Sequence, residues 1–254
     1  MNPNDYPPMK RFFLFLTLLA LFIISVHSQT TVNALRVLET HPNTTAWVLS
    51  GQEQLTGQAF QQDALVSYNG FQYTVYYNAT RNVTIARRAL PSGSWKEVVL
   101  PHRNTADDAH NVIAMGICKN DGSIHLSYDH HNTTLRYCRS ILGLAHDPSP
   151  EAWSQSAFGA TTSALVPGIS VPDVTYPRFI EKPDGNLLFE CRYKLSGDGD
   201  SYLREYDGNT HRWTHIGRYV QGMDASPNAC AYINRMDYDV LGRLHVSWCW
   251  RDDF

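Results

Sequence analysis

A pair of strands joined by a tight glycine turn recurs along most of the chain, and it constrains the fold more than any other feature. The four copies are SYNGFQYTVYY, KNDGSIHLSYD, KPDGNLLFECRY and YDVLGRLHVSWCW. Their turns fall at Asn69-Gly70, Asp121-Gly122, Asp184-Gly185 and Leu241-Gly242. Asn-Gly and Asp-Gly favour the positive φ angles that hairpin turns require. Apolar residues alternate beside these turns, as in IHLSY, and this alternation predicts half-buried strands.

The spacing of the turns predicts how the hairpins are organised. Consecutive turns lie about 57 residues apart, which is too long for a hairpin alone and fits one four-stranded blade with its loops. Almost no helical periodicity is present after the N-terminal segment. We therefore predict an all-β chain that forms a β-propeller of four-stranded blades. A β-sandwich is the alternative, but it would not require the same turn once in every unit.

The number of units predicts a partial propeller. Residues 29–254 hold about four of them, and a propeller closes with about four to eight blades. The last strand pattern, LHVSWCW, is followed only by RDDF, which does not resemble a closing strand. We therefore expect residues 29–254 to be one partial propeller domain, truncated at its C-terminus. The number of cysteines, five, is odd, so either one thiol is free or a disulfide partner is missing from the chain. The chain has no CxxC pair, which argues against a cysteine zinc site.

The N-terminal segment predicts secretion. Lys10 and Arg11 precede the apolar run FFLFLTLLALFIISV, and the small residues of HSQ follow. This order is typical of a secretory signal peptide, here residues 1–28, although an uncleaved anchor is the alternative. The mature chain would then be extracellular and free of the membrane. Its sequons predict glycosylation at Asn43, Asn78, Asn82 and Asn132.

Net charge and aromatic content indicate which classes of partner the chain can bind. The formal net charge is −3 and no long run of either sign occurs, which argues against a nucleic-acid partner. The 14 Tyr, 10 Phe and 6 Trp suit both sheets and sugar-binding clefts. We expect a monomer that binds a polysaccharide.

Two pairs of polar residues lie symmetrically about two of the turns. His110 and His130 each lie about ten residues from the centre of the hairpin at Asp121, and Tyr176 and Arg192 each lie about eight residues from the centre at Asp184. Residues equidistant from an antiparallel turn face one another. Because equivalent ends of adjacent blades share one face of a propeller, the four side chains should form one cluster.

The predicted cluster suits the cleavage of a uronate-containing polysaccharide by β-elimination. The proton beside the uronate carboxylate is weakly acidic, and neutralising that carboxylate stabilises the charge that develops when the proton leaves. Arginine is well shaped for such a carboxylate, and histidine and tyrosine can act as base and acid. His110 and Tyr176 would be the catalytic pair, with either one as the base. His130 and Arg192 would hold the carboxylate.

Four stretches of the sequence resemble the BNR-repeat family of secreted seven-bladed propellers. They are DDAHNVIAMGICKNDGSIHLSYDHH, VTYPRF, FECRY and GRLHVSWCWRDDF, and the resemblance covers roughly residues 45–254. The family includes ulvan lyases and related lyases that cut rhamnose–glucuronate linkages. The resemblance implies that His110 and Tyr176 are the base and the acid, and that His130 and Arg192 lie around the uronate carboxylate. Only about four of the family's seven blades are present here.

Two other functions stay open at this point. The first is a glycoside hydrolase on the same fold, although no carboxylate pair that could flank a scissile bond stands out. The second is a non-catalytic carbohydrate-binding propeller. The chain has no nucleophile elbow, phosphate-binding glycine loop or HExxH helix, so we expect no cofactor. Adjacent strand residues such as His130 and His131 point to opposite faces, so no metal site is predicted, and a structural metal lacks support from the sequence.

Overall fold

The computed structural model describes Val48–Leu49, Glu53–Gln54, Asp63 and residues 65–106, 108–195, 199–222 and 230–251. The predicted signal peptide and the sequon at Asn43 lie outside these residues. Strands make up the regular structure of the described part, apart from one 3-10 turn, η2 (Gln155–Ala157). No helix in this part is long and apolar enough to cross a membrane. The prediction of an all-β chain is confirmed.

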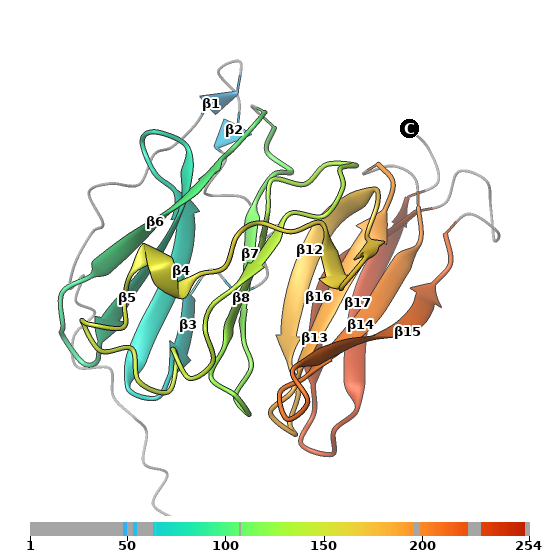
Figure 1. Ribbon diagram of the computed structural model, residues 1–254. Coiled ribbons are helices and arrows are strands. Elements are labelled where there is room, and N and C mark those ends of the chain that lie inside the picture. The colour runs from blue at the N-terminus through green and yellow to red at the C-terminus, as the bar shows by residue number, and fades with distance from the viewer. Residues whose placement is uncertain are drawn as a thin grey trace, which may run out of the picture. The chain divides into compact units, whose positions relative to one another are not determined.

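The strands form four antiparallel sheets in which neighbours in sequence are neighbours in space (Figure 1). The first sheet contains β3 (Leu65–Tyr68), β4 (Phe71–Tyr77), β5 (Asn82–Ala89) and β6 (Lys96–Arg103). The second contains β7 (Ile113–Ile117), β8 (Ile124–Tyr128) and β9 (Tyr137–Arg139). The third contains β12 (Val174–Glu181), β13 (Leu187–Tyr193), β14 (Ser201–Asp207) and β15 (Arg212–Val220). The fourth contains β16 (Cys230–Tyr238) and β17 (Leu244–Arg251). Two short pairs complete the described strands, β1 (Val48–Leu49) with β2 (Glu53–Gln54) and β10 (Ala164–Val166) with β11 (Ile169–Ser170).

Each of the four predicted glycine turns joins the first two strands of one sheet. Gly70, Gly122, Gly185 and Gly242 have φ angles of 78°, 65°, 84° and 75°. Gly185 has a second reason to be glycine, because an added Cβ would lie 2.2 Å from Oδ1 of Asn120. Nδ2 of Asn120 donates to the carbonyl of Asp184 at 3.0 Å, so the turns of the second and third sheets are bonded to each other.

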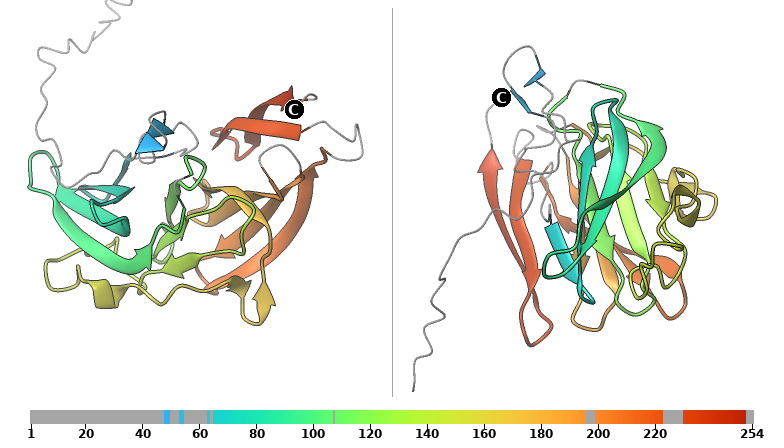
Figure 2. Two further views of the ribbon diagram at one scale, coloured as in Figure 1. Left: turned by 90° about the horizontal axis from the view of Figure 1, so that it is seen from above. Right: turned by 90° about the vertical axis from the view of Figure 1, so that its left-hand side faces the viewer.

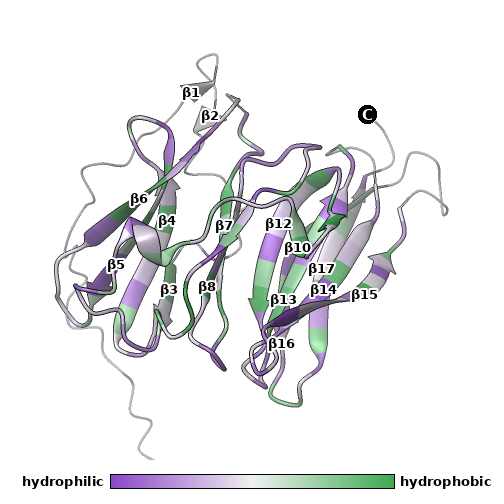
Figure 3. Cartoon of the chain, in the orientation of Figure 1, coloured by the Kyte–Doolittle hydropathy of each residue, from purple (hydrophilic) through white to green (hydrophobic). Residues whose placement is uncertain are grey.

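The sheets follow one another side by side in chain order (Figure 2), and apolar side chains fill the space between neighbours. Ile85 of the first sheet and Leu126 of the second share one core cluster. Ala114 of the second sheet and Phe189 of the third share another. Ile180 and Met236 share the cluster between the third and fourth sheets. Strands buried on both faces therefore appear in the hydropathy view as green bands within the sheets (Figure 3). The five cysteines are free thiols.

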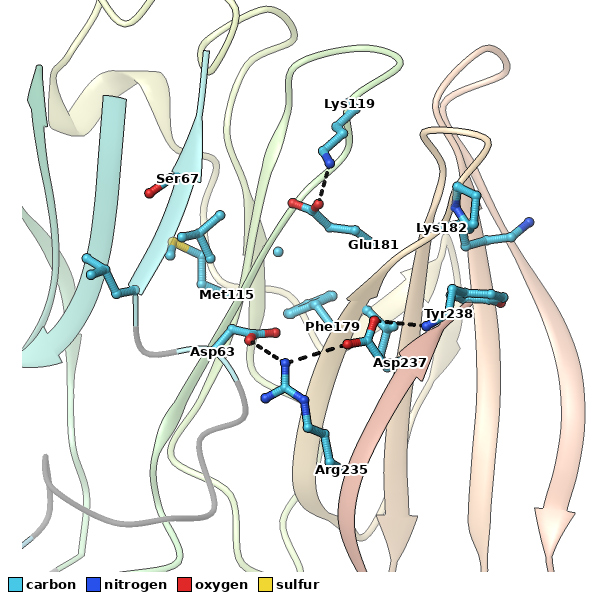
Figure 4. Close-up of a pocket in the computed structure, with 15 residues that line it drawn as sticks. Asp63, Ser67, Met115, Lys119, Phe179, Glu181, Lys182, Arg235, Asp237 and Tyr238 are labelled. Carbon is cyan, nitrogen blue, oxygen red and sulfur yellow. Dashed lines mark hydrogen bonds and ion pairs between the residues drawn. The ribbon is translucent and has the colours of Figure 1, made fainter. Parts of the chain in front are cut away.

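The first strands of the four sheets line one pocket of about 350 Å³ (Figure 4). Its walls come from β3, β7, β12 and β16, as expected for the innermost strands of propeller blades. The charges in it are paired: Lys119 lies 2.7 Å from Glu181, and Arg235 lies 3.6 Å from Asp63. The charged side chains of the pocket thus neutralise one another.

Candidate active site

The register of the second sheet brings His110 opposite His131. Ile113 pairs with Tyr128 at the open end of the β7–β8 hairpin. Continuing that register beyond the strand ends sets His110 against His131, one residue away from the predicted partner His130. The rings of His110 and His131 are stacked, with centroids 4.1 Å apart. A shift of one residue in strand register changes which side chain faces a given partner, and here it places His131 instead of His130 opposite His110.

Asp108 holds both stacked histidines. Nδ1 of His110 donates to Oδ1 of Asp108, and Nδ1 of His131 donates to Oδ2 at 2.5 Å. The backbone N–H of His110 also donates to Oδ1 at 2.9 Å. Burial by itself would raise the pKa of Asp108, but the hydrogen bonds from the two histidines outweigh it and lower that pKa well below its usual range. Asp108 is therefore a stable anion between two imidazoles, a role that the sequence did not reveal.

These hydrogen bonds fix the tautomer of each imidazole. An ionised carboxylate can only accept, so Nδ1 of His110 and Nδ1 of His131 carry protons. In the neutral ring Nε2 is then an unprotonated acceptor. Nε2 of His131 is buried and has no hydrogen-bond partner among the described residues. The side chain of His110 is 28% exposed, so solvent or a ligand can reach it.

His130 lies in a different environment from the stacked pair. Its side chain is fully buried, with Nε2 3.1 Å from Oγ of Ser127 and Nδ1 2.9 Å from Oγ1 of Thr133. Burial lowers the pKa of His130 to about 3, so the ring is neutral at ordinary pH. The structure brings His110, Tyr176 and Arg192 together, as predicted. His130 is buried apart from them, and His131 is the histidine that stacks on His110.

Tyr176 reaches the cluster from a bulge in the third sheet. Thr175 pairs with Arg192, but the register shifts before Arg178, so Tyr176 lies in the irregular segment between them. Its φ angle is 52°, in the left-handed region that a tyrosine rarely adopts. Its ring centroid is 5.7 Å from that of His110. The tyrosine is therefore turned toward the histidines by a local departure from strand geometry.

Arg192 also lies close to the ring of Tyr176. Its guanidinium carbon is 5.2 Å from the ring centroid of Tyr176 and 4.6 Å from that of Tyr232. It also donates to the carbonyl of Ala231 in β16, and the residue is only 2% exposed. Tyr232, which the sequence did not single out, thus extends the cluster into the fourth sheet.

Two buried hydrogen-bonding groups position the loops that carry these residues. Asp129, fully buried, accepts from Nδ2 of Asn111 at 2.7 Å and from Oγ1 of Thr105 at 2.8 Å, and it lies 3.0 Å from Nε2 of His102. Asn111 follows His110 and Asp129 precedes His130, so the hydrogen bond between Asn111 and Asp129 links the segments that carry the two histidines. Oγ1 of Thr175 accepts from the backbone N–H of Asn132 at 2.8 Å, which links the loop after β8, the histidine loop that carries His130 and His131, to β12.

The three described sequons lie in different surroundings. Asn132 is exposed at the end of the histidine loop. Asn78 is half-buried, and its Oδ1 accepts from the backbone N–H of Thr80 at 3.0 Å. Nδ2 of Asn82 donates to the carbonyl of Leu100 at 3.2 Å, and this is the atom to which a glycan would be attached. Glycosylation at Asn132 therefore requires the least rearrangement.

A metal ion has one possible ligand set in the described part of the chain. Asp108, His110 and His131 each offer a ligand atom, and these atoms lie within 4.8 Å of one another. Two imidazoles and a carboxylate are a donor set that zinc accepts. However, the two Nδ1 atoms are directed at Asp108 itself. A metal bound through the Nδ1 atoms would displace both hydrogen bonds, whereas one bound through Nε2 would leave them in place.

The fold and the cluster together define a class of protein: a β-propeller with histidines, a tyrosine and an arginine gathered at the open ends of adjacent blades. The model of the BNR repeat-containing family matches residues 71–254, and the chain belongs to this family. The resemblance read from the sequence motifs is thereby confirmed.

Curated relatives of the chain are ulvan lyases. The short isoform from Alteromonas sp. (strain LOR) is 26% identical over 232 residues, which cover 73% of this chain and 43% of that enzyme. The long isoform from Pseudoalteromonas sp. (strain PLSV) is 25% identical over 227 residues, which cover 73% of this chain and 22% of that enzyme. The chain thus spans less than half the length of these relatives.

One solved structure has a similar fold. The crystal structure of polysaccharide lyase Uly1 matches with a TM-score of 0.69 at 21% identity, over 89% of this chain and 54% of that one. This likeness confirms the predicted propeller architecture. The number of blades stays a prediction.

Proposed function

We propose that this chain carries the acid–base centre of a secreted polysaccharide lyase that cleaves a uronate-containing glycan of the rhamnose–glucuronate type by β-elimination. The observation that carries the proposal is one continuous cluster, in which Asp108 holds His110 and His131, Tyr176 lies against His110, and Arg192 lies against Tyr176. The relatedness to ulvan lyases supports the same reaction and the same class of substrate.

His110 is the proposed base. The hydrogen bond from its Nδ1 to Asp108 leaves Nε2 as the unprotonated nitrogen of the neutral ring, and its side chain is the more exposed of the two stacked histidines. Nε2 would take the proton from the carbon that bears the uronate carboxylate. The electron pair of that C–H bond would form the new carbon–carbon double bond, and the neighbouring bond to the glycosidic oxygen would break. Asp108 would stabilise the imidazolium that results.

Tyr176 is the proposed acid. A phenol carries its proton at neutral pH and can give it to the departing glycosidic oxygen. The ring of Tyr176 lies near both the ring of His110 and the guanidinium of Arg192, so a sugar bound beside it would be near both. Arg192 and one further donor would neutralise the carboxylate. His130 was predicted for that second role, but His131 is the histidine beside His110, and we propose His131 in its place.

The substrate is a large extracellular polymer, which agrees with the signal peptide proposed for residues 1–28. A secreted, glycosylated monomer with no cofactor is the state that we propose for the protein.

The test uses the full chain, with rhamnose–glucuronate polysaccharide as substrate. We expect ultraviolet absorbance from unsaturated uronate to appear, and we expect His110→Ala to reduce its rate at least 100-fold, the lower end of the usual loss for general acid–base groups of about 10²–10⁴. His215→Ala is the matched control, because His215 is exposed on β15 and outside the cluster.

Other products would contradict the proposal. Release of reducing sugar without ultraviolet absorbance would indicate a hydrolase. Binding of the intact polysaccharide without either product would indicate a carbohydrate-binding propeller.

A further inference from the structure

A second pocket lies between the second and third sheets, away from the histidine cluster. Its walls are β9, the β10–β11 hairpin and the start of β15 with the turn before it. Its volume is about 880 Å³, more than twice that of the pocket between the first strands and within the usual range of ligand sites, about 300–1,000 Å³. None of Asp108, His110, His131, Tyr176 and Arg192 lines it.

The charged side chains that line this pocket are cationic. They are Arg139 from β9 and Arg212 from the start of β15; His211 of the preceding turn also lines the pocket, and no aspartate or glutamate does. Among the described residues, no carboxylate lies within ion-pair distance of Arg139 or Arg212. A concave surface with one sign of charge attracts ligands of the opposite sign.

The nearby carboxylates are already engaged. Asp121, next to His211 at 3.2 Å, is buried and also accepts from the hydroxyl of Tyr206 at 2.7 Å. Asp207, which pairs with Arg212 across the strands, accepts from the backbone N–H of Asn209 at 2.8 Å and the hydroxyl of Thr210 at 3.0 Å. The guanidinium of Arg212 is exposed and remains available for an external anion.

Two aromatic rings that cannot turn freely also line the pocket. The rings of Tyr137 and Trp213 lie edge to face, with centroids 6.1 Å apart. Nε1 of Trp213 donates to the hydroxyl of Tyr137 at 3.4 Å, and that hydroxyl lies 2.7 Å from Nδ1 of the buried His125. Because burial lowers the pKa of His125 to about 3, this ring is a neutral partner that holds the tyrosine in place. The pocket therefore offers a preformed apolar surface beneath a cationic rim.

We propose that this pocket is a second glycan-binding site, which takes one anionic sugar residue carrying a carboxylate or a sulfate ester. The sugar ring would lie against Trp213 and Tyr137, and its anionic group would be held by Arg212 and Arg139, with His211 beside them. Arginine is the residue best shaped for either anion, because its planar N–H groups donate two parallel hydrogen bonds. The choice of glycan rests on the proposed function, whereas the pocket and its charge do not. Such a site would hold a polymer at a second point while its cleavage proceeds at the histidine cluster.

The test is a binding measurement on the full chain carrying His110→Ala, so that no substrate is consumed. The reporter is the indole N–H resonance of Trp213 in an NMR spectrum of ¹⁵N-labelled protein, assigned by its loss in Trp213→Phe. Rhamnose–glucuronate oligosaccharides with and without sulfate esters are titrated separately. We expect the resonance to shift, and retention of the shift without sulfate would assign the carboxylate as the bound group. Loss of the shift would assign the sulfate.

A charge reversal at the rim tests the role of the arginines. We expect Arg212→Glu to weaken binding at least ten-fold, as the loss of a charge-assisted hydrogen bond and the gain of a repulsive charge require. Lys96→Glu makes the same change in net charge at an exposed position of β6 outside the pocket and should leave the affinity unchanged. A resonance that moves with neither oligosaccharide, or an affinity that falls equally in both variants, would overturn the inference.

The ultraviolet assay of the unmutated chain separates this inference from the proposed function. Unsaturated product without a shift at Trp213 would overturn the second site alone. A shift at Trp213 without any product would support the site and overturn the lyase.

Discussion

At the residue scale, Tyr176 combines an unusual backbone conformation with a central place in the cluster. A φ of 52° costs a non-glycine residue about 1–2 kcal/mol, so the surrounding bulge must hold it there. Tyr176→Phe keeps the ring against His110 and Arg192 and removes only the hydroxyl. We expect the elimination rate to fall about 100-fold or more, while the melting temperature stays near that of the unmutated chain.

The measurement for Tyr176→Phe is the rate of ultraviolet absorbance increase, together with a thermal melt. Tyr202→Phe is the matched control, since Tyr202 is a partly buried tyrosine that stacks on Tyr193 outside the cluster. Equal rates for Tyr176→Phe and the unmutated chain would remove the tyrosine from the role of acid.

The neighbouring histidines His130 and His131 should differ in what their loss affects. His131→Asn removes the ring stacked on His110 from a site 22% exposed, so we expect a large loss of activity with little loss of stability. His130→Asn removes a fully buried ring with partners on both nitrogens, so we expect unfolding to become easier by about 1–3 kcal/mol. Urea denaturation and the ultraviolet assay on both variants check this pair, and the reverse pattern would restore His130 as the functional histidine.

At the element scale, Asp129 joins the loops at the open end of the second sheet. Besides its contacts with Asn111, Thr105 and His102, it lies 3.2 Å from the guanidinium of Arg136. Asp129→Asn keeps the shape but replaces an acceptor with an amide that faces several donors. We expect the free energy of unfolding to fall by about 3 kcal/mol, as is usual for a broken buried ion pair. We also expect a lower elimination rate, because the segments that carry His110 and His131 would loosen.

Urea denaturation and the ultraviolet assay check Asp129→Asn. Asp239→Asn is the control, because Asp239 also accepts several hydrogen bonds in a hairpin but does so at the surface. If the two variants lost the same stability, the buried network around Asp129 would not have the importance assigned to it.

The elements also show where sequence patterns succeed and where they stop. Hairpin turns depend on local chemistry, and all four were predicted because glycine supplies a positive φ wherever it is placed. Register is less local. The histidine prediction was displaced by one residue because the centre of a six-residue turn region cannot be read to half a residue. Pro177 does signal a bulge in β12, but it does not say which way the bulge turns Tyr176.

At the scale of the whole molecule, two buried histidines make stability depend on pH. Burial lowers the pKa values of His125 and His130 to about 3, whereas an exposed histidine in the unfolded chain has a pKa of about 6.5. Below pH 6.5 the unfolded state therefore binds more protons than the folded state, and acid favours unfolding. We expect the free energy of unfolding to fall by up to about 1.4 kcal/mol per pH unit for each histidine between pH 6.5 and 4.5.

Urea denaturation at pH 7, 6 and 5 measures this slope. His130→Asn should reduce the slope of the unfolding free energy against pH by up to about 1.4 kcal/mol per pH unit, the contribution of one titrating histidine. An unchanged slope in that variant would mean that His130 is protonated in the folded state.

The sequence by itself determined the all-β class, the repeated hairpins and the proximity of His110, Tyr176 and Arg192. These follow from short-range patterns: turn residues fix hairpins, and hairpins that recur at similar intervals indicate repeated units whose equivalent ends share one face. Tertiary structure decided the rest. It alone joined Asp108 to two histidines, chose His131 over His130, added Tyr232 from the fourth sheet, and enclosed a cationic pocket between β9 and β15. The physical reason is that such contacts depend on strand register, bulges and the packing of neighbouring sheets, which no local stretch of sequence specifies.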